Sequence, residues 1–243
     1  VVTGKPIVLG GSLGRTSATG DGVAIAVREA LRIKGIDPHG ATVAVQGFGK
    51  VGYWAALAME NMGLKVVAVS DVNGGVTGFS NVSSIFDYAN AHGSVIGAPG
   101  TENISNEELL GLDVDVLVPA ALADAITEST APKIRAKIVV EGANAPTTPA
   151  GDEIMNDKGI LVVPDILANS GGVIVSYFEW VQDKQNYFWS ASEVKENLNS
   201  ILMRSITEVS ERSASQQVTW REAANMIGVG RVAQAHRLRG LYP

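Results

Sequence analysis

Three glycines in the pattern Gly-x-Gly-x-x-Gly are the residues of this sequence that indicate most directly what the protein could bind. The segment VAVQGFGKVG, residues 43–52, is an apolar run followed by the pattern Gly47-x-Gly49-x-x-Gly52. In a dinucleotide-binding fold the first glycine makes a tight turn, the second lets the backbone approach a pyrophosphate, and the third lets the following helix pack close to the strand. The phosphates would face the positive end of that helix. The other candidate cofactor-binding residues of this loop are Phe48, Lys50 and Val51.

A carboxylate follows at the distance expected of a ribose-binding acid. Asp71 ends the next apolar run and lies 19 residues after Gly52, close to the usual spacing of about 20. A carboxylate there binds ribose hydroxyls and repels a 2′-phosphate, which favours NAD over NADP. Lys50 adds a positive charge that offsets part of this repulsion, so both cofactors remain candidates. The alternative is that Asp71 only caps the turn 71–74.

The elements that would position these residues follow from the pattern of apolar runs. Five short runs rich in valine and isoleucine, without polar alternation, predict strands buried on both faces, at residues 42–46, 65–70, 114–119, 137–140 and 160–163. Helical segments at residues 23–31 and 53–62 end before Gly35 and Gly63. Capping boxes begin at Ser105, Ser190 and Thr219. Three helices are expected after residue 165, at residues 170–184, 192–212 and 220–239.

This alternation predicts a doubly wound, mostly parallel α/β sheet of the Rossmann type, closed by C-terminal helices. We expect a single dinucleotide-binding domain over residues 1–243. Within it, residues 1–20 form an interdomain segment, residues 21–185 the Rossmann-like core, and residues 186–243 the C-terminal helices.

Composition excludes several classes of function. A net charge of −6 argues against a nucleic-acid or membrane-surface partner. The chain has no cysteine, and its three histidines are far apart, so no metal site is expected. No apolar run approaches the ~20 residues that cross a bilayer. The N-terminus lacks the features of a signal peptide, and we expect a cytoplasmic location.

Three further stretches turn the glycine pattern into a specific resemblance. They are GKPIVLGGSLGRTSATG (residues 4–20), EGANAPTTP (141–149) and NSGGVIVSYFEWVQ (169–182). In this order around the glycine loop, they resemble the coenzyme-binding domain of glutamate dehydrogenase. The resemblance implies reversible oxidative deamination of L-glutamate to 2-oxoglutarate and ammonium with a nicotinamide cofactor. It also implies a homo-oligomer for the intact enzyme, whereas the isolated domain would be a monomer or weak dimer.

For the cofactor, the resemblance implies roles for one threonine and two asparagines. Thr19 and Asn169 would hold the nicotinamide carboxamide, and Asn144 would meet the cofactor ribose. For Asn144, a purely local turn role is the alternative, because asparagine is common in turns. Lys50 departs from the family, which commonly has asparagine at that position.

For the substrate, the resemblance implies Arg15, Val173 and Ser176. The Ser176 hydroxyl would bond the side-chain carboxylate of glutamate, and Arg15 would lie near the cleft. The spacing of Asn169, Val173 and Ser176 predicts that they share one helix face. The alternatives are an acid partner for Arg15, core packing for Val173, and packing of a small side chain against the sheet for Ser176.

The family's catalytic lysine and aspartate belong to an N-terminal substrate domain, and neither segment occurs here. We therefore expect no catalytic residue in this chain, and cofactor binding without turnover. The apolar residues of the last helix would then be partly exposed: Trp220, Met226, Ile227, Val232 and Leu238.

Other functions fit less well. A short-chain reductase requires tyrosine four residues before lysine, and no tyrosine here has that neighbour. The segment GGSLGRTS lacks the Gly-Lys-[Ser/Thr] ending of a phosphate loop. A methyltransferase has no place for the three additional stretches. A non-catalytic nucleotide-binding or sensor module remains an alternative.

Overall fold

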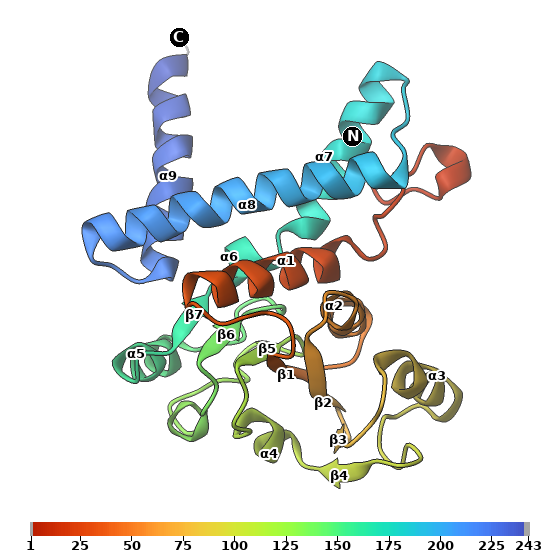
Figure 1. Ribbon diagram of the computed structural model, residues 1–243. Helices are drawn as coiled ribbons and strands as arrows, with labels where there is room; N and C mark the ends of the chain where they lie inside the picture. The colour runs from red at the N-terminus through yellow and green to blue at the C-terminus, as the bar shows by residue number, and fades with distance from the viewer. Residues whose placement is uncertain (1, 241–243) are drawn as a thin grey trace.

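Residues 2–240 are described by a computed structural model, and seven of their strands form one sheet (Figure 1). The strand order is β4-β3-β2-β1-β5-β6-β7. Five strands pair in parallel: β1 (Thr42–Gln46), β2 (Lys65–Asp71), β5 (Val116–Pro119), β6 (Ile138–Val140) and β7 (Leu161–Val163). An antiparallel edge is added by β3 (Gly74–Thr77) and β4 (Glu102–Ile104). The predicted α/β fold with a mostly parallel sheet is therefore confirmed.

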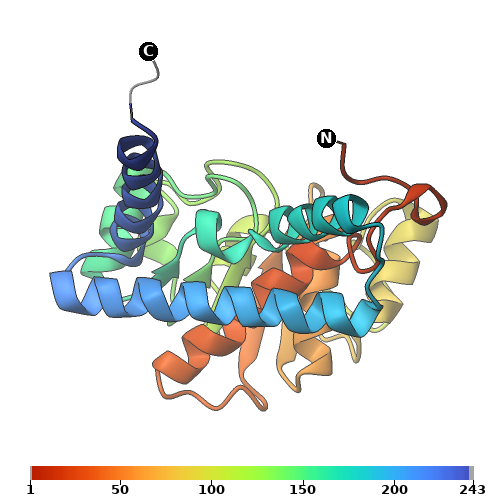
Figure 2. The same cartoon turned by 90° about the horizontal axis from the view of Figure 1, so that it is seen from above.

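Helices cover both faces of the sheet (Figures 1 and 2). One face carries α1 (Ala18–Ile33), α2 (Lys50–Asn61) and α7 (Gly171–Gln185), and α8 (Ala191–Gln216) lies across them. The other face carries α4 (Asn106–Leu110) and α5 (Pro149–Asp157). The remaining helices are α3 (Val82–His92), α6 (Asp165–Ala168), α9 (Trp220–Arg239) and the short η1 (Ile7–Leu9) and η2 (Ala131–Lys133).

The central strands are apolar throughout because each of their faces packs against a helical layer. In β1, Val43 and Val45 belong to the core under α1 and α2, whereas Ala44 belongs to the core under α4 and α5. In β5, Leu117 likewise faces the second core. A strand buried on both faces has no polar side to alternate with, which is the pattern that the sequence contains.

Most of the predicted elements are present, and the differences have local causes. All five predicted strands form, and the three capping boxes close at Ser105, Ser190 and Thr219. The sequence analysis did not predict β3, β4, α3, α5 or α6. Strand β3 begins with two glycines, Gly74 and Gly75, which resemble a turn in sequence, and β4 has only three residues, all partly or fully exposed.

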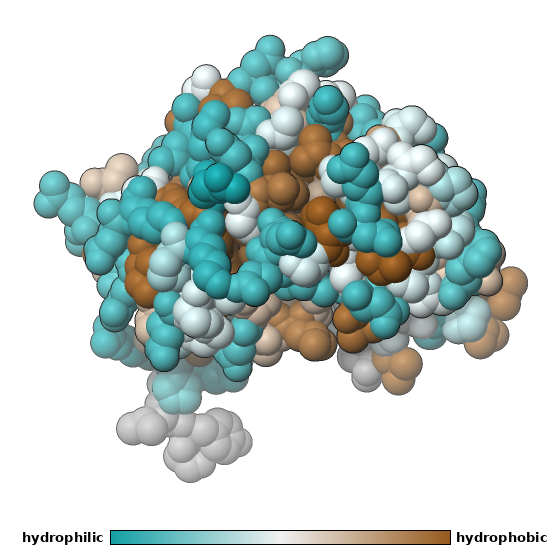
Figure 3. All heavy atoms as spheres, turned by 90° about the horizontal axis from the view of Figure 1, so that it is seen from below, coloured by the Kyte–Doolittle hydropathy of each residue, from teal (hydrophilic) through white to brown (hydrophobic). Residues whose placement is uncertain are grey.

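The last helix is buried only in its first half, so the expected exposure is confirmed for Met226, Val232 and Leu238 and is wrong for Trp220 and Ile227. Trp220 and Ile227 are 8% and 9% exposed, whereas Met226, Val232 and Leu238 are 44%, 72% and 81% exposed. In Figure 2 the outer half of α9 projects away from α8. Figure 3 shows the face opposite to that of Figure 2, on which hydrophilic residues surround several apolar patches. Within residues 2–240, no helix is both long and apolar enough to cross a membrane.

Candidate cofactor-binding cleft

The glycine loop lies between β1 and α2, and two of its glycines are required by close contacts. Gly47 has φ +91°, and a Cβ on it would lie 2.7 Å from the backbone of Ala121. A Cβ on Gly52 would lie 1.7 Å from the Gly47 carbonyl oxygen. In contrast, a Cβ on Gly49 would meet no atom within 4 Å. The loop is therefore tightly packed on its protein side and open at the middle glycine.

The open side of this loop is the N-terminus of α2. Gly49 is the N-cap residue and supplies no side-chain cap, so the first N–H groups of the helix are available to an anion. Phe48 is 7% exposed and packs edge-on against Tyr53, at 5.9 Å between ring centroids. Only the backbone of Phe48 can therefore reach a ligand. Lys50 is exposed at the first helical position.

Asp71 ends β2 next to the glycine loop, and its carboxylate already organises a turn. Its two oxygens accept backbone N–H groups from Asn73 at 2.8 Å and Val95 at 2.7 Å. The turn-capping alternative therefore describes a real contact. A carboxylate has about four lone-pair positions, however, so two bonds leave room for ribose hydroxyls.

The remaining predicted residues line one hollow of about 770 Å³. It lies at the carboxyl ends of β1, β5 and β6. Strands β2, β3 and β4 lie on one side of β1, and β5, β6 and β7 lie on the other. The hollow therefore lies between β1 and β5, where the strand order reverses. Ligands of open α/β sheets bind at such points. The predicted residues that line it are Arg15, Thr19, Val51, Asn144, Asn169, Val173 and Ser176.

Arg15 and Ser176 are in direct contact within this cleft. Arg15 Nε donates to Ser176 Oγ at 3.0 Å, and the Ser176 hydroxyl donates to the Gly172 carbonyl at 3.0 Å. Among residues 2–240, no acid lies within ion-pair distance of Arg15. Val173 is 67% exposed, so the alternative of core packing is wrong for this residue. Its helix presents that position to the cleft instead of to the sheet.

Asn169 and Asn144 hold each other. Asn169 Nδ2 donates to Asn144 Oδ1 at 2.8 Å and approaches the carbonyls of Gly142 and Ala143 at 3.4 and 3.3 Å. Asn169 is the residue after α6 and precedes α7. Because α6 ends at Ala168 and α7 begins at Gly171, Asn169 lies in the turn between the two helices. The prediction that it shares a helix face with Val173 and Ser176 is therefore wrong. All three still face the same hollow.

Two glycines allow α7 to approach α1 at the cleft. A Cβ on Gly171 would lie 2.0 Å from the Ala18 carbonyl oxygen. A Cβ on Gly172 would lie 2.5 Å from Thr19 Oγ1 and 3.5 Å from an Arg15 guanidinium nitrogen. The close crossing of these helices brings Thr19 and Arg15 beside Ser176.

The N-terminal segment is fixed to α7 by a buried carboxylate. Lys5 Nζ contacts Glu179 at 2.6 Å and Asp183 at 2.7 Å, and the backbone N–H of Gly4 donates to Glu179 at 2.9 Å. The Glu179 side chain is fully buried. Burial alone would raise the pKa of Glu179, but the hydrogen bonds from Lys5 and Gly4 outweigh it and lower this pKa. This attachment places Thr3 at the rim of the cleft.

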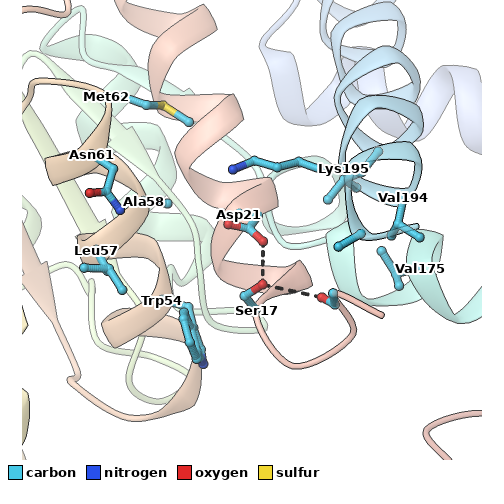
Figure 4. Close-up of a pocket in the computed structure, with 13 residues that line it drawn as sticks. Ser17, Asp21, Trp54, Leu57, Ala58, Asn61, Met62, Val175, Val194 and Lys195 are labelled. Atoms are coloured by element: carbon cyan, nitrogen blue, oxygen red, sulfur yellow. Dashed lines mark hydrogen bonds between the residues drawn. The ribbon is translucent and has the colours of Figure 1, made fainter. Parts of the chain in front are cut away.

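A second hollow, of about 390 Å³, lies between α1, α2 and α8 (Figure 4). Trp54 and Leu57 line it from α2. The Lys195 side chain points toward Asp21 (Figure 4). The Asp21 carboxylate accepts a hydrogen bond from the Ser17 hydroxyl at 2.6 Å. None of the residues predicted from the sequence lines this hollow. Among residues 2–240, no group of His, Cys, Asp or Glu side chains is arranged to hold a metal ion.

The sequence profile of the glutamate/leucine/phenylalanine/valine dehydrogenases matches residues 10–240. The chain belongs to this family.

Two curated relatives show how much of a family member this chain covers. A glutamate dehydrogenase of Thermotoga maritima is 53% identical over 247 residues, which are 100% of this chain and 59% of the relative. A cryptic catabolic NAD-specific glutamate dehydrogenase of Bacillus subtilis is 48% identical, over 98% of this chain and 56% of the relative. The chain thus spans less than two thirds of the length of these relatives.

Solved family structures share the fold closely. The hetero-hexameric glutamate dehydrogenase of Thermus thermophilus, in its Leu-bound form, matches with a TM-score of 0.94 and 38% identity, over 100% of this chain and 58% of that one. The enzyme of Peptoniphilus asaccharolyticus matches with a TM-score of 0.85 and 39% identity, over 99% and 57% of the two chains.

The structure adds cleft residues that the sequence analysis did not name. The loop after β5 supplies four of them and the N-terminal segment one. They are Ala120, Ala121, Leu122, Ala123 and Thr3. The rule that ligands bind at carboxyl ends of parallel strands would have indicated the β5 loop. Thr3 reaches the cleft because the neighbouring Gly4 and Lys5 are bound to α7.

Proposed function

We propose that this chain is the nicotinamide-dinucleotide-binding part of a glutamate dehydrogenase. The intact protein would interconvert L-glutamate with 2-oxoglutarate and ammonium. The observation that carries the proposal is the cleft at the strand-order reversal. It combines an uncapped helix N-terminus, two hydrogen-bonded asparagines, and an arginine bonded to a serine.

The residues present fit the cofactor from one end to the other. The backbone of residues 47–52 would hold the pyrophosphate, and Asp71 would bind the adenosine ribose. Thr19, Asn144 and Asn169 would bind the nicotinamide ribose and carboxamide. Val51 lines the cleft and lies in the first turn of α2, so it would join the two halves of the site. When bound, the cofactor would supply the hydride acceptor.

Arg15 and Ser176 would form the substrate side of the cleft, with Val173 as its apolar wall. Arg15 is half-buried and lines the cleft, and its guanidinium suits a carboxylate because arginine presents its donors in a planar fork. Amino-acid oxidation also requires a base and a positioned water. We assign neither to this chain, and place the catalytic lysine and aspartate in a separate domain of the intact protein. Residues 1–20 would be the segment that leads to that domain.

NAD is the favoured cofactor. Asp71 would repel a 2′-phosphate, and the Bacillus relative is named NAD-specific. NADP would bind more weakly, because the positive charge of Lys50 would offset only part of the repulsion between Asp71 and the 2′-phosphate. The Thermus relative is hetero-hexameric, which supports an oligomer for the intact protein. This chain alone would be a monomer or a weak dimer in the cytoplasm.

A titration of the chain with NADH and with NADPH, followed by cofactor fluorescence, tests this function. Saturable NADH binding, with weaker NADPH binding and no glutamate-dependent NADH formation, is the expected result. Absence of NADH binding would contradict the proposal. NADH formation from glutamate by this chain alone would contradict the separate catalytic domain, and cofactor binding unaffected by glutamate analogues in the intact protein would favour a sensor module.

A further inference from the structure

Arg221, in the first turn of α9, binds three carboxylates from three different elements. Its guanidinium nitrogens contact Glu141 at 2.7 and 3.0 Å and Asp152 at 3.0 and 3.1 Å. Asp165 lies 3.8 Å away. Glu141 follows β6, Asp152 lies in α5, and Asp165 begins α6. One side chain of the last helix therefore joins the segments around the carboxyl ends of β6 and β7.

The contacts continue from these carboxylates into the cleft. Glu141 Oε2 also accepts the backbone N–H of Asp165 at 2.9 Å. Asp165 in turn accepts the backbone N–H of Ala145 at 2.7 Å, and its carbonyl accepts that of Asn169 at 3.0 Å. Asn144, beside Ala145, accepts from the Asn169 amide. Arg221 does not line the cleft, yet it binds Glu141 directly, at the start of the loop 141–146 that carries Asn144. It also lies 3.8 Å from Asp165, which accepts the N–H of Ala145 in the same loop.

The loop needs this support because its backbone is in an unfavourable conformation. Ala145 has φ +46°, in the left-handed region that residues with a Cβ rarely adopt. Such residues persist where surrounding contacts hold them. Here the N–H of Ala145 is bound by Asp165, and its carbonyl accepts the N–H of Asp124 at 3.0 Å.

The three carboxylates around Arg221 depend on its positive charge. The side chain of Glu141 is fully buried, and those of Asp152 and Asp165 are 14% and 24% exposed. Without the guanidinium, three negative charges would be left in a small volume, one of them cut off from water. Breaking a buried ion pair from one side is strongly destabilising for this reason.

We propose that Arg221 is a positioning residue, which sets the conformation of residues 141–146 and thereby the affinity for the nicotinamide half of the cofactor. The inference rests on the proposed function, because it takes Asn144 and Asn169 as contacts of that half. The adenosine half, bound by residues 47–52 and Asp71, would be independent of Arg221.

The test compares two ligands in variants of the present chain. NADH contains both halves of the cofactor, whereas ADP contains only the adenine half. Arg221→Met should weaken NADH binding about fivefold, the effect of losing about one hydrogen bond, and leave ADP binding unchanged. Arg221→Lys keeps the charge but not the two-pronged geometry, and should fall between Arg221→Met and the wild type. Asp165→Ala, which removes the acceptor for Ala145, should reproduce the NADH-selective loss.

The matched control is Arg231→Met, which removes an exposed arginine of the same helix that pairs with Glu208. It should change neither affinity. All measurements are made where circular dichroism shows each variant folded. Equal weakening of NADH and ADP, or no change in either for both Arg221→Met and Asp165→Ala, would overturn the inference. A wild-type chain that binds neither ligand would instead contradict the proposed function.

Discussion

The guanidinium of Arg15 and the hydroxyl of Ser176, which both line the cleft, are joined by a hydrogen bond of 3.0 Å. The two residues come from segments that are 161 positions apart. The bond uses only Nε of the arginine. Among residues 2–240, no other hydrogen-bond or ion-pair partner holds the remaining guanidinium nitrogens, so they can meet an anion while Ser176 holds the group in place.

Replacement of Ser176 by alanine tests the substrate side of the cleft. Ser176→Ala removes the acceptor for Arg15, so in the intact protein the KM for glutamate should rise about fivefold, as for the loss of one hydrogen bond. NADH affinity should stay within about twofold of the wild type. A fall in NADH affinity without a change in KM would place Ser176 on the cofactor side.

Asp71→Asn tests cofactor choice while keeping one of the two contacts that Asp71 makes in the turn. The asparagine oxygen can still accept the N–H of Asn73, whereas its NH2 group cannot accept the N–H of Val95. Asparagine also has no charge to repel a 2′-phosphate. The ratio of NADPH to NADH affinity should rise about tenfold, as expected for about 1.4 kcal/mol. Asp37→Asn is the control, because Asp37 accepts the N–H of His39 in a similar turn. An unchanged ratio in Asp71→Asn would mean that Asp71 serves the turn alone.

The buried Glu179 gives stability a defined dependence on pH. Its pKa is lowered below the ordinary value of 4.5 because the bonds from Lys5 and Gly4 outweigh burial. A carboxylate with a lowered pKa contributes stability above its unfolded pKa, and loses it as the pH falls through the folded value. Urea unfolding between pH 3 and pH 7 should therefore show a fall in stability below about pH 4.5 that is smaller in Glu179→Gln. Parallel curves for the two proteins would contradict this assignment.

Two helical glycines should respond in opposite ways to alanine. Gly171→Ala places a Cβ 2.0 Å from the Ala18 carbonyl, so we expect at least about 2 kcal/mol of destabilisation from overpacking. Gly228→Ala meets no atom within 4 Å in α9, and should stabilise the chain by about 0.5–1 kcal/mol. Urea denaturation measures both. Similar effects of the two changes would show that α1 and α7 can separate without cost.

Elements that depend on residues close in sequence were predicted, whereas elements that depend on tertiary pairing were not. Local signals were sufficient for the five parallel strands, for the three capping boxes and for the glycine loop, because each depends on neighbouring residues. The short antiparallel strands β3 and β4 were missed because tertiary pairing, not local preference, makes them extended.

The candidate site was predictable in its members and less so in its geometry. The resemblance indicated that Asn144, Asn169 and Ser176 belong together, and the structure places them around one hollow. Their mutual bonds depend on where α6 ends and how closely α7 approaches α1. The role of Arg221 depends on a contact across 80 positions with Glu141, for which the sequence carries no local signal.

The most direct test of the central claim is the NADH affinity of Gly49→Val compared with the wild type. Gly49 has φ −80°, and a Cβ there would meet no atom within 4 Å, so valine should leave the fold intact at a small cost in stability, because valine is a weaker N-cap residue than glycine. Its side chain would, however, occupy the approach to the helix N-terminus. We expect at least about tenfold weaker NADH binding in a fully folded variant, with Gly228→Ala binding as the wild type does. Equal NADH affinity in Gly49→Val and the wild type would contradict binding of the cofactor at this loop.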